Sequence, residues 1–432
     1  MSKIVYQMAL RTFTPEGTLQ AATKLLPHVA SLGVDILYVC PFYVQENDPN
    51  TAYWSVRQIA SNTGNPKNPY KISDYFHVDE EYGTEQDLKD FAAEAHRLGL
   101  LVFYDLVYLH CGRQAVFIEA HPDFVERNED GSVRVPDRWP FARLNFADRE
   151  LREYLMQNME LLVSEYGADG FRCDVGDSVP LDFWQEAFSR VKRLNPALLT
   201  LNEGVDPRYI DGTFDMGYSF AFQKRMRQIF AMGADAVGLR EMYENERKRY
   251  GKNQKKLLRA LDNHDTASDV GKERNEILMT SRGVDAALVV ATTYLGVPFL
   301  WNGYELCDDA ENCMFSNREH GKRSAMDWSK GFTAQGKRRL SHVKRLHGLY
   351  HTSVALSEGE LAFVENSQPS AVISYVRSCA QERILVVVNS KNHPVTADIA
   401  EELQGTPLLR YGARQTGNRV RLAPYGYLVL KL

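Results

Sequence analysis

The sequence lacks the features of a membrane protein or a secreted precursor. Its 432 residues contain no run of about 18 consecutive apolar residues, which is roughly what a bilayer-crossing helix needs. The beginning, Met1-Ser2-Lys3-Ile4-Val5-Tyr6, has no apolar region of the kind found in signal peptides. We therefore expect a cytoplasmic protein without a membrane partner.

The sequence also has no excess of positive charge and contains few cysteines. The chain has 51 Lys and Arg against 56 Asp and Glu, so its formal net charge is -5. Nucleic-acid binding needs a concentrated basic face, so we exclude a nucleic-acid partner. The six cysteines are scattered and form no CxxC pair, and nothing requires an oxidising compartment. A mildly acidic surface suits a neutral substrate without selecting one.

Short apolar runs alternate with helical patterns along most of the chain. Repeated strand-helix units with buried strands predict a parallel sheet, and eight units favour a closed (β/α)8 TIM barrel. An open doubly wound sheet is the alternative, and the lack of a Gly-rich turn after the first strand disfavours it. The eight predicted strands are Ile4–Ala9, Val34–Cys40, Leu101–Val107, Gly170–Asp174, Leu198–Asn202, Phe214–Tyr218, Leu257–Leu261 and Pro298–Trp301.

Two segments depart from this alternation and predict further domains. Residues 106–145 form a charged, turn-rich insertion after the third strand. Residues 351–432 contain strand-like runs separated by Gly and Asn turns, which favours an all-β sandwich. The barrel itself would then consist of residues 1–105 and 146–350.

Polar residues follow several predicted strands at the point where each strand ends. In a barrel of this kind such residues point into the active site. A single acid there is often only a helix cap, but acids after several strands are hard to explain as caps. The strand-end residues are Asp105, His110, Arg172, Asp174, Glu203, Asn263, His264 and Asp265.

This set of residues is suited to cleaving a glycosidic bond with retention of configuration at the anomeric carbon. It needs two carboxyl groups about 5–5.5 Å apart, one as nucleophile and one as acid/base. Asp174 lies two residues after Arg172, so both side chains leave the same strand face, and a guanidinium lowers the pKa of a neighbouring carboxyl. Glu203 must keep its proton, so we expect acidic neighbours to raise its pKa. Asp265 would hold substrate hydroxyls, as would His110 and His264.

Four segments resemble the signature segments of the α-amylase family (glycoside hydrolase family 13), in the same order and at the same strand ends. The likeness extends over roughly residues 4–350. It implies a barrel with a short domain B at about 106–145 and retaining action on α-glucosidic bonds. The four segments are Asp105-Leu-Val-Tyr-Leu-His110, Gly170-Phe-Arg-Cys-Asp174, Leu201-Asn-Glu203 and Leu261-Asp-Asn-His-Asp265.

The resemblance also implies roles for individual residues. Asp174 would be the nucleophile, Glu203 the acid/base and Asp265 the stabiliser of the transition state. Tyr70 would stack on the sugar at the cleavage subsite. The remaining substrate contacts would be Asp105, His110, Arg172 and His264, with the strand-end Asn263 beside them.

Leu109 and the acids of the insertion indicate whether to expect a calcium site, which some family members have. The family usually has Asn immediately before its first-segment His, whereas this chain has Leu109, which offers no side-chain oxygen to a cation. We therefore predict no metal and no cofactor, and in particular no calcium at the usual site. Asp123, Asp130 and Asp137 in the insertion are interpreted as solvated loop acids.

Two residues at the positions that hold the leaving-group sugars also differ from the family pattern, so more than one reaction remains compatible with the sequence. Asp177 and Ser178 stand where starch-cleaving members have Lys and His, so plain endo-acting specificity does not follow. We predict a hydrolase of α-glucans or malto-oligosaccharides. A transglycosylase or a sucrose-type phosphorylase would use the same chemistry. A non-catalytic carbohydrate-binding homologue is the alternative from another class, and the presence of all three acids argues against it. An unrelated metal-dependent barrel is a further reading, which the match to the family order disfavours.

Overall fold

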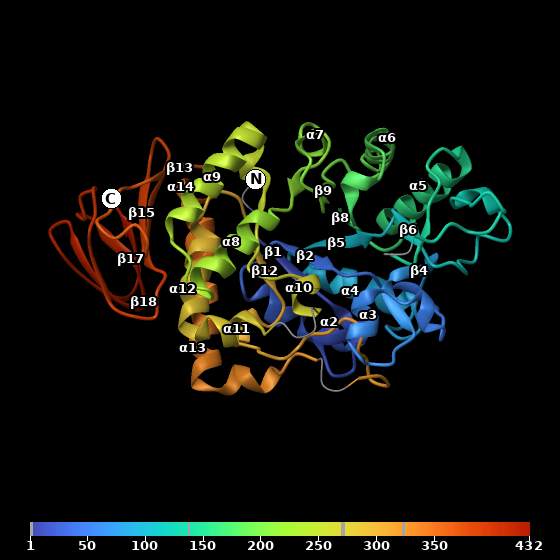
Figure 1. Ribbon diagram of the computed structural model, residues 1–432, viewed down its shortest axis with the longest axis horizontal. Helices are drawn as coiled ribbons and strands as arrows, with labels where there is room; N and C mark the ends of the chain where they lie inside the picture. The colour runs from blue at the N-terminus through green and yellow to red at the C-terminus, as the bar shows by residue number, and fades with distance from the viewer. Residues whose placement is uncertain (1–2, 137–138, 269–272, 322–324) are drawn as a thin grey trace.

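The computed structural model describes residues 3–136, 139–268, 273–321 and 325–432 (Figure 1). Asp137, one of the three loop acids considered as metal ligands, lies outside the described residues. Within the described ranges, no helix has both the length and the apolar character needed to pass through a bilayer.

Eight parallel strands form the centre of the molecule, as predicted. Each strand pairs with the next one in chain order, and the last pairs with the first. A single parallel bridge between Gly217 and Leu257 joins the sixth strand to the seventh and closes the barrel. The strands are β1 (Val5–Met8), β2 (Ile36–Val39), β5 (Leu101–Leu106), β8 (Gly170–Cys173), β9 (Leu199–Asn202), β10 (Met216–Gly217), β11 (Leu258–Arg259) and β12 (Val297–Trp301).

Helices follow the strands and cover the barrel. α4 begins with a capping box, in which the side chains of Thr84 and Asp87 each bond to a backbone N–H of the other residue. The α-helices are α1 (Leu10–Phe13), α2 (Leu19–Ala30), α3 (Val56–Ala60), α4 (Glu85–Arg97), α5 (Arg149–Ser164), α6 (Leu181–Val191), α7 (Pro207–Ile210), α8 (Phe220–Phe230), α9 (Val237–Tyr250), α10 (His264–Ser268), α11 (Asn275–Leu278), α12 (Thr280–Thr293), α13 (Ala334–Thr352) and α14 (Val354–Ser357).

A hairpin that the sequence analysis did not predict projects from the barrel between β2 and α4. Its strands β3 (Tyr43–Asn47) and β4 (Lys67–Val78) pair in an antiparallel manner, and α3 lies between them. The register shifts three times along this pair, which disturbs the alternation of apolar and polar residues and hides the strands from sequence patterns. The hairpin carries Tyr70 on β4 and Arg57 on α3 toward the barrel mouth.

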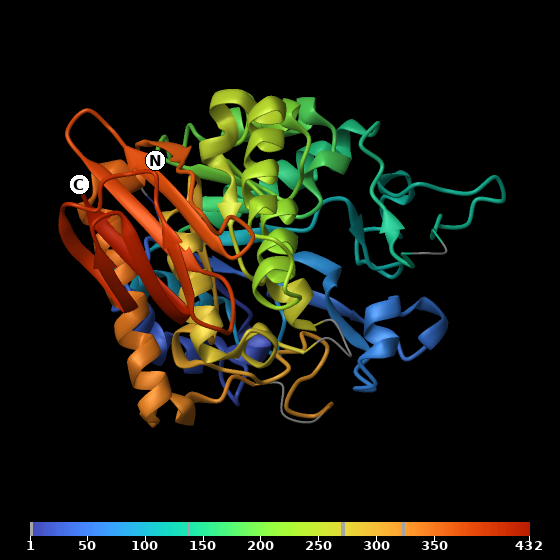
Figure 2. The ribbon, with the colours of Figure 1, turned by 60° about the vertical axis from the view of Figure 1, so that its left-hand side comes forward.

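The predicted insertion after the third barrel strand contains only a small antiparallel pair. β6 (His110–Cys111) pairs with β7 (Ala142–Arg143), and the rest of the described insertion is mostly turns and short bridges. In Figures 1 and 2 the insertion, coloured cyan, extends from the end of the molecule opposite the C-terminal strands. His110, one of the predicted site residues, is the first residue of β6.

The C-terminal segment is all-β, as predicted, and its six strands form one antiparallel sheet. The first strand begins at Glu360, because α13 and α14 continue the helical part of the chain to Ser357. Tyr375 and Arg377 on this sheet bond to the end of α12, Tyr375 at Thr293 Oγ1 (2.6 Å) and Arg377 at the carbonyl oxygens of residues 293 and 294. The strands are β13 (Glu360–Phe363), β14 (Val372–Ser378), β15 (Arg383–Asn389), β16 (Val395–Asp398), β17 (Thr406–Thr416) and β18 (Arg419–Lys431).

Gly170, the first residue of β8, permits the close approach of its two neighbouring strands. A Cβ atom there would lie 2.3 Å from the ring of Phe103 on β5 and 2.5 Å from the carbonyl oxygen of Leu199. We predict that Gly170→Ala destabilises the protein by at least about 1–3 kcal/mol, the usual effect of overpacking a core. Thermal unfolding measures this.

The control is Gly348→Ala in α13, where no atom lies within 4 Å of the added Cβ. Alanine favours a helix over glycine, so this variant should melt at or above the temperature of the unchanged protein. Equal melting temperatures for Gly170→Ala and the unchanged protein would contradict the packing argument.

Candidate active site

The three predicted catalytic carboxylates line one cavity of about 650 Å³ at the carboxyl ends of the barrel strands. Asp174 directly follows β8, Glu203 directly follows β9, and Asp265 lies in α10 after β11. Tyr70, His110 and His264 line the same cavity. Since parallel strands deliver their ends to one face of the barrel, residues far apart in the sequence meet here.

Arg172 holds the buried acids together. Its guanidinium is fully buried, and Nη1 donates to Oδ1 and Oδ2 of Asp105 (2.7 and 2.8 Å) and to Oδ1 of Asp174 (2.8 Å). Nη2 lies 2.7 Å from Oε2 of Glu203. One cation therefore contacts three carboxylates, and two of them are the predicted nucleophile and acid/base.

Burial dominates the protonation of the two carboxyls that flank this guanidinium. It raises the pKa of Asp174 well above its ordinary value, and Glu203 adds to the rise while Arg172 opposes it. Burial likewise raises the pKa of Glu203, against Arg172 and with a contribution from Asp265. The pKa of Glu203 is raised as expected, but burial contributes more than the acidic neighbours that the sequence analysis invoked. The expectation that Arg172 would keep the pKa of Asp174 low was wrong, because the desolvation of a buried acid outweighs one guanidinium that three acids share.

Asp265 has the opposite electrostatic environment. Burial acts to raise its pKa, but His264, Arg57 and Arg172 together lower the pKa below the ordinary value. Arg57 forms an ion pair with Oδ1 of Asp265. Because Arg57 comes from α3 in the hairpin between β2 and α4, no strand-end pattern could have indicated it from the sequence.

The two predicted histidines are neutral at ordinary pH. Burial lowers the pKa of His110 to about 3 and the pKa of His264 to about 4. Gln7 on β1 places its Nε2 amide 2.7 Å from Nδ1 of His264. An amide nitrogen donates only, so the ring proton of His264 is on Nε2, which lies 3.8 Å from Oδ1 of Asp265. Gln7 was missed, although a polar residue inside the apolar strand Val5–Met8 is a signal that could have found it.

Tyr70 forms part of the cavity wall at the level of His264. The two rings are stacked with centroids 5.1 Å apart and planes 13° apart. The Tyr70 hydroxyl donates to Oδ2 of Asp105 (2.8 Å), and Tyr38 on β2 donates to the same oxygen (2.7 Å). Asp105 and Arg172 are fully buried and are not among the described residues that line the cavity, so they orient Tyr70, Asp174 and Glu203 from behind.

The side chain of Asn263 stabilises the local backbone at the start of α10. Its Oδ1 accepts from the backbone N–H groups of Asp265 (3.1 Å) and Thr266 (3.0 Å), which caps the first turn of α10. Asn263 is buried and is not among the described cavity-lining residues. It positions Asp265 through the backbone.

The insertion contributes one wall of the cavity. Leu109, Trp139 and Phe141 line it together with His110, and the His110 ring packs on Phe141 with centroids 4.5 Å apart. The side chain of Leu109 packs against the hydrophobic core, and its backbone oxygen accepts from the Leu144 N–H (3.3 Å). The absence of calcium at this position stays a prediction.

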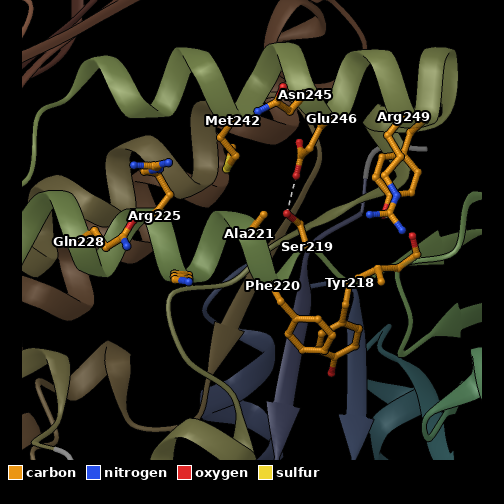
Figure 3. A pocket seen from close by; sticks show the side chains of 13 residues that line it. Tyr218, Ser219, Phe220, Ala221, Arg225, Gln228, Met242, Asn245, Glu246 and Arg249 are labelled. Carbon is orange, nitrogen blue, oxygen red and sulfur yellow. Dashed lines mark hydrogen bonds between the residues drawn. The ribbon is translucent and has the colours of Figure 1, made fainter.

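A second cavity of about 370 Å³ lies between α8 and α9 (Figure 3). Val205 and Phe220 line both cavities. The carboxylate of Glu246 in this cavity accepts from Ser219 and is paired with Arg259 (3.0 Å). These contacts tie α9 to the barrel, and we assign Glu246 a structural role.

Similarity to known proteins agrees with this geometry. The family model described as the catalytic domain of α-amylase matches residues 6–131. A cyclomaltodextrinase from a Bacillus species is 27% identical over 87% of this chain and 66% of its own length. An α-amylase, MalA, from Haloarcula japonica is 26% identical over 94% of this chain and 58% of its own length. The chain thus spans about three fifths to two thirds of these relatives.

Solved structures share the fold along the whole chain. An α-amylase from Lactobacillus plantarum superposes with a TM-score of 0.79 at 21% identity, covering 100% of this chain and 99% of that one. The maltogenic α-amylase AmyB from Thermotoga neapolitana superposes with a TM-score of 0.78 at 23% identity, covering 100% and 96%. These structures share the fold of this chain, and the family model and the curated relatives make its sequence similar to that of the α-amylase family.

Proposed function

We propose that this protein is a retaining glycoside hydrolase that cleaves α-glucosidic bonds of α-glucans or malto-oligosaccharides. The observation that carries the proposal is that Asp174 and Glu203 line one cavity and contact the same buried guanidinium. Names among the similar proteins, such as cyclomaltodextrinase and maltogenic α-amylase, support an oligo- or polysaccharide of glucose as substrate.

The reaction is a double displacement at the anomeric carbon. A carboxylate oxygen of Asp174 forms a bond to that carbon while the glycosidic bond breaks, and Glu203 gives its proton to the leaving oxygen. Water then attacks the same carbon, Glu203 takes the proton of the water, and Asp174 is released. The pKa values of both carboxyls are raised, so the pair retains a proton more readily than isolated acids do; we propose that this proton is on Glu203 and that Asp174 is ionised beside Arg172.

The other cavity residues hold the sugar. Asp265 stays ionised, accepts hydrogen bonds from sugar hydroxyls and stabilises the positive charge that develops on the ring. The neutral imidazoles of His110 and His264 act as hydrogen-bond donors, because an uncharged ring is cheaper to bury than a cation. The ring of Tyr70 offers an apolar face to the sugar at the cleavage subsite.

Product analysis tests the proposal directly. The protein should release sugars from maltotriose and maltoheptaose, with products that are first formed as the α-anomer by NMR. Asp174→Asn should lower turnover by about 10³-fold or more because it removes the nucleophile. The matched control Asp130→Asn changes an exposed insertion acid and should keep full turnover.

Sugar phosphates formed only when phosphate is added would show a phosphorylase, and longer oligosaccharides without net hydrolysis would show a transglycosylase. Unchanged turnover in Asp174→Asn would refute the assignment of the nucleophile.

The raised pKa of Glu203 also predicts how stability depends on pH. A carboxyl whose folded pKa lies above its unfolded value stabilises the fold fully at low pH, and this stabilisation is lost as pH rises through the folded pKa. Glu203→Gln removes that loss. The melting temperature of the variant minus that of the unchanged protein should therefore increase from about pH 4 to about pH 8. A difference that is constant over this range would contradict the electrostatic description of the site.

Metal independence is a further expected outcome. Leu109 gives the usual calcium position no side-chain oxygen, so a calcium chelator should change neither the melting temperature nor the turnover. Thermal unfolding with and without the chelator measures this, and added calcium is the control. A large fall in melting temperature that calcium reverses would show that oxygens elsewhere bind the ion.

A further inference from the structure

Asp177 lies between the two loops that carry the proposed nucleophile and the proposed acid/base. It belongs to the short 3-10 turn Gly176–Ser178, three residues after Asp174. The sequence comparison left its role open, because Asp177 stands where related starch-cleaving proteins have a lysine. In this structure Asp177 lines the active-site cavity beside Glu203, and its carboxylate accepts hydrogen bonds from the turn that follows β9.

Three hydrogen bonds join Asp177 to this turn, on both sides of Glu203. Its Oδ1 accepts from Nδ2 of Asn202 (2.6 Å), and its Oδ2 accepts from the backbone N–H groups of Val205 (2.6 Å) and Asp206 (2.7 Å). Charge-assisted bonds of this length are strong. A lysine at this position has no acceptor, so it would leave the two backbone donors without this partner.

The fit between the carboxylate and the turn is close. A Cβ atom on Gly204 would lie 2.1 Å from Oδ1 of Asp177, and a Cβ atom on Gly176 would lie 2.2 Å from Oδ1 of Asn202. Any larger residue at either glycine would therefore displace the side chain of Asp177 or of Asn202 from this contact. The contact needs glycine on both loops as well as the aspartate.

The loop that carries Asp177 also holds Glu203 directly. The N–H of Val175 donates to Oε2 of Glu203 (3.0 Å), and the N–H of Gly176 donates to its carbonyl oxygen (3.1 Å). Val175 adopts a left-handed backbone conformation with φ of +42°, which is strained for a β-branched residue. Such strain persists where surrounding contacts enforce it, and Asp177 supplies contacts of that kind one residue beyond Gly176.

We infer that Asp177 is a positioning residue that fixes the turn 202–206 and so holds the carboxyl of Glu203 in line with the leaving oxygen. This inference rests on the proposed function. It assigns Asp177 a role in proton transfer, and the KM for maltotriose distinguishes this role from a contact with the leaving sugar. A misplacement of about 1 Å in a reacting group can lower a rate about 100-fold. Loss of the hydrogen bonds between Asp177 and the turn 202–206 should therefore lower the rate measurably.

The test compares substrates that need the acid with substrates that do not. An aryl α-maltoside with a nitrophenyl leaving group departs without full protonation, whereas maltotriose needs a proton from Glu203. Asp177→Asn keeps the size of the side chain but puts a donor where an acceptor is required. We expect kcat/KM, which reports the step that breaks the glycosidic bond, to fall about 10- to 100-fold on maltotriose and much less on the aryl maltoside, with no rise in KM for maltotriose.

A second readout is the pH profile. The alkaline limb of kcat reports loss of the Glu203 proton, so it should shift in Asp177→Asn. The matched control is Asp182→Asn, which makes the same chemical change in an exposed acid paired with Arg152 on the surface. It should leave kcat, KM and the pH profile unchanged.

A second variant keeps the inference testable if Asp177→Asn fails to fold. In Gly204→Ala the added Cβ atom would displace the carboxylate of Asp177 from the turn. This variant should show the same larger loss of activity on maltotriose than on the aryl maltoside. Equal losses on both substrates with an unchanged pH profile, in whichever variant folds, would overturn the inference and show a general structural role. A rise in KM for maltotriose alone would overturn it in favour of a substrate contact. An unchanged protein inactive on both substrates would instead refute the proposed function.

Discussion

The buried guanidinium of Arg172 is the interaction on which the site depends. It contacts the carboxylates of Asp105, Asp174 and Glu203, which reach it from three different strands. Buried charges are costly to desolvate, and removing one partner of a buried ion pair typically destabilises a protein by about 3–5 kcal/mol. The cluster therefore locks the relative positions of β5, β8 and β9. Burial raises the pKa of Asp174 and of Glu203, and a single guanidinium that three acids share does not offset this rise.

The barrel makes this cluster possible, and the segments outside the barrel complete the cavity. Strand ends supply the acids, because all eight parallel strands end on one face. The hairpin between β2 and α4 adds Tyr70 and Arg57, and the insertion adds His110 with the apolar side chains around it. The barrel thus carries the proposed reacting groups, while the longer connections form further walls of the cavity.

Backbone contacts position the acids as much as side-chain contacts do. Asn263 caps the helix that carries Asp265, and the N–H of Val175 bonds to Glu203. Both roles follow from local geometry, since an N-cap oxygen and a left-handed residue redirect the chain over a few residues. A polar residue next to a catalytic acid in the sequence can therefore serve the acid without touching the substrate.

The sequence by itself determined the architecture and indicated the acids that we propose as reacting groups. Eight buried strands gave apolar runs that are readable without a structure, and acids at their ends meet wherever such strands close into a barrel. The C-terminal all-β segment was readable for the same reason, since its strands and turns are local patterns.

Tertiary structure alone decided the environment of those groups. Burial raised the pKa of Asp174 although Arg172 is two residues away, because desolvation depends on everything that surrounds a side chain. Arg57 reaches Asp265 across 208 positions, from a hairpin whose irregular register left no periodic signal. Asp177 and Asn263 are polar residues near the proposed catalytic acids in the sequence, and only the tertiary structure shows which backbone and side-chain groups each of them bonds to. Local sequence patterns record which residues are near in the chain, whereas electrostatics and side-chain direction depend on which residues are near in space.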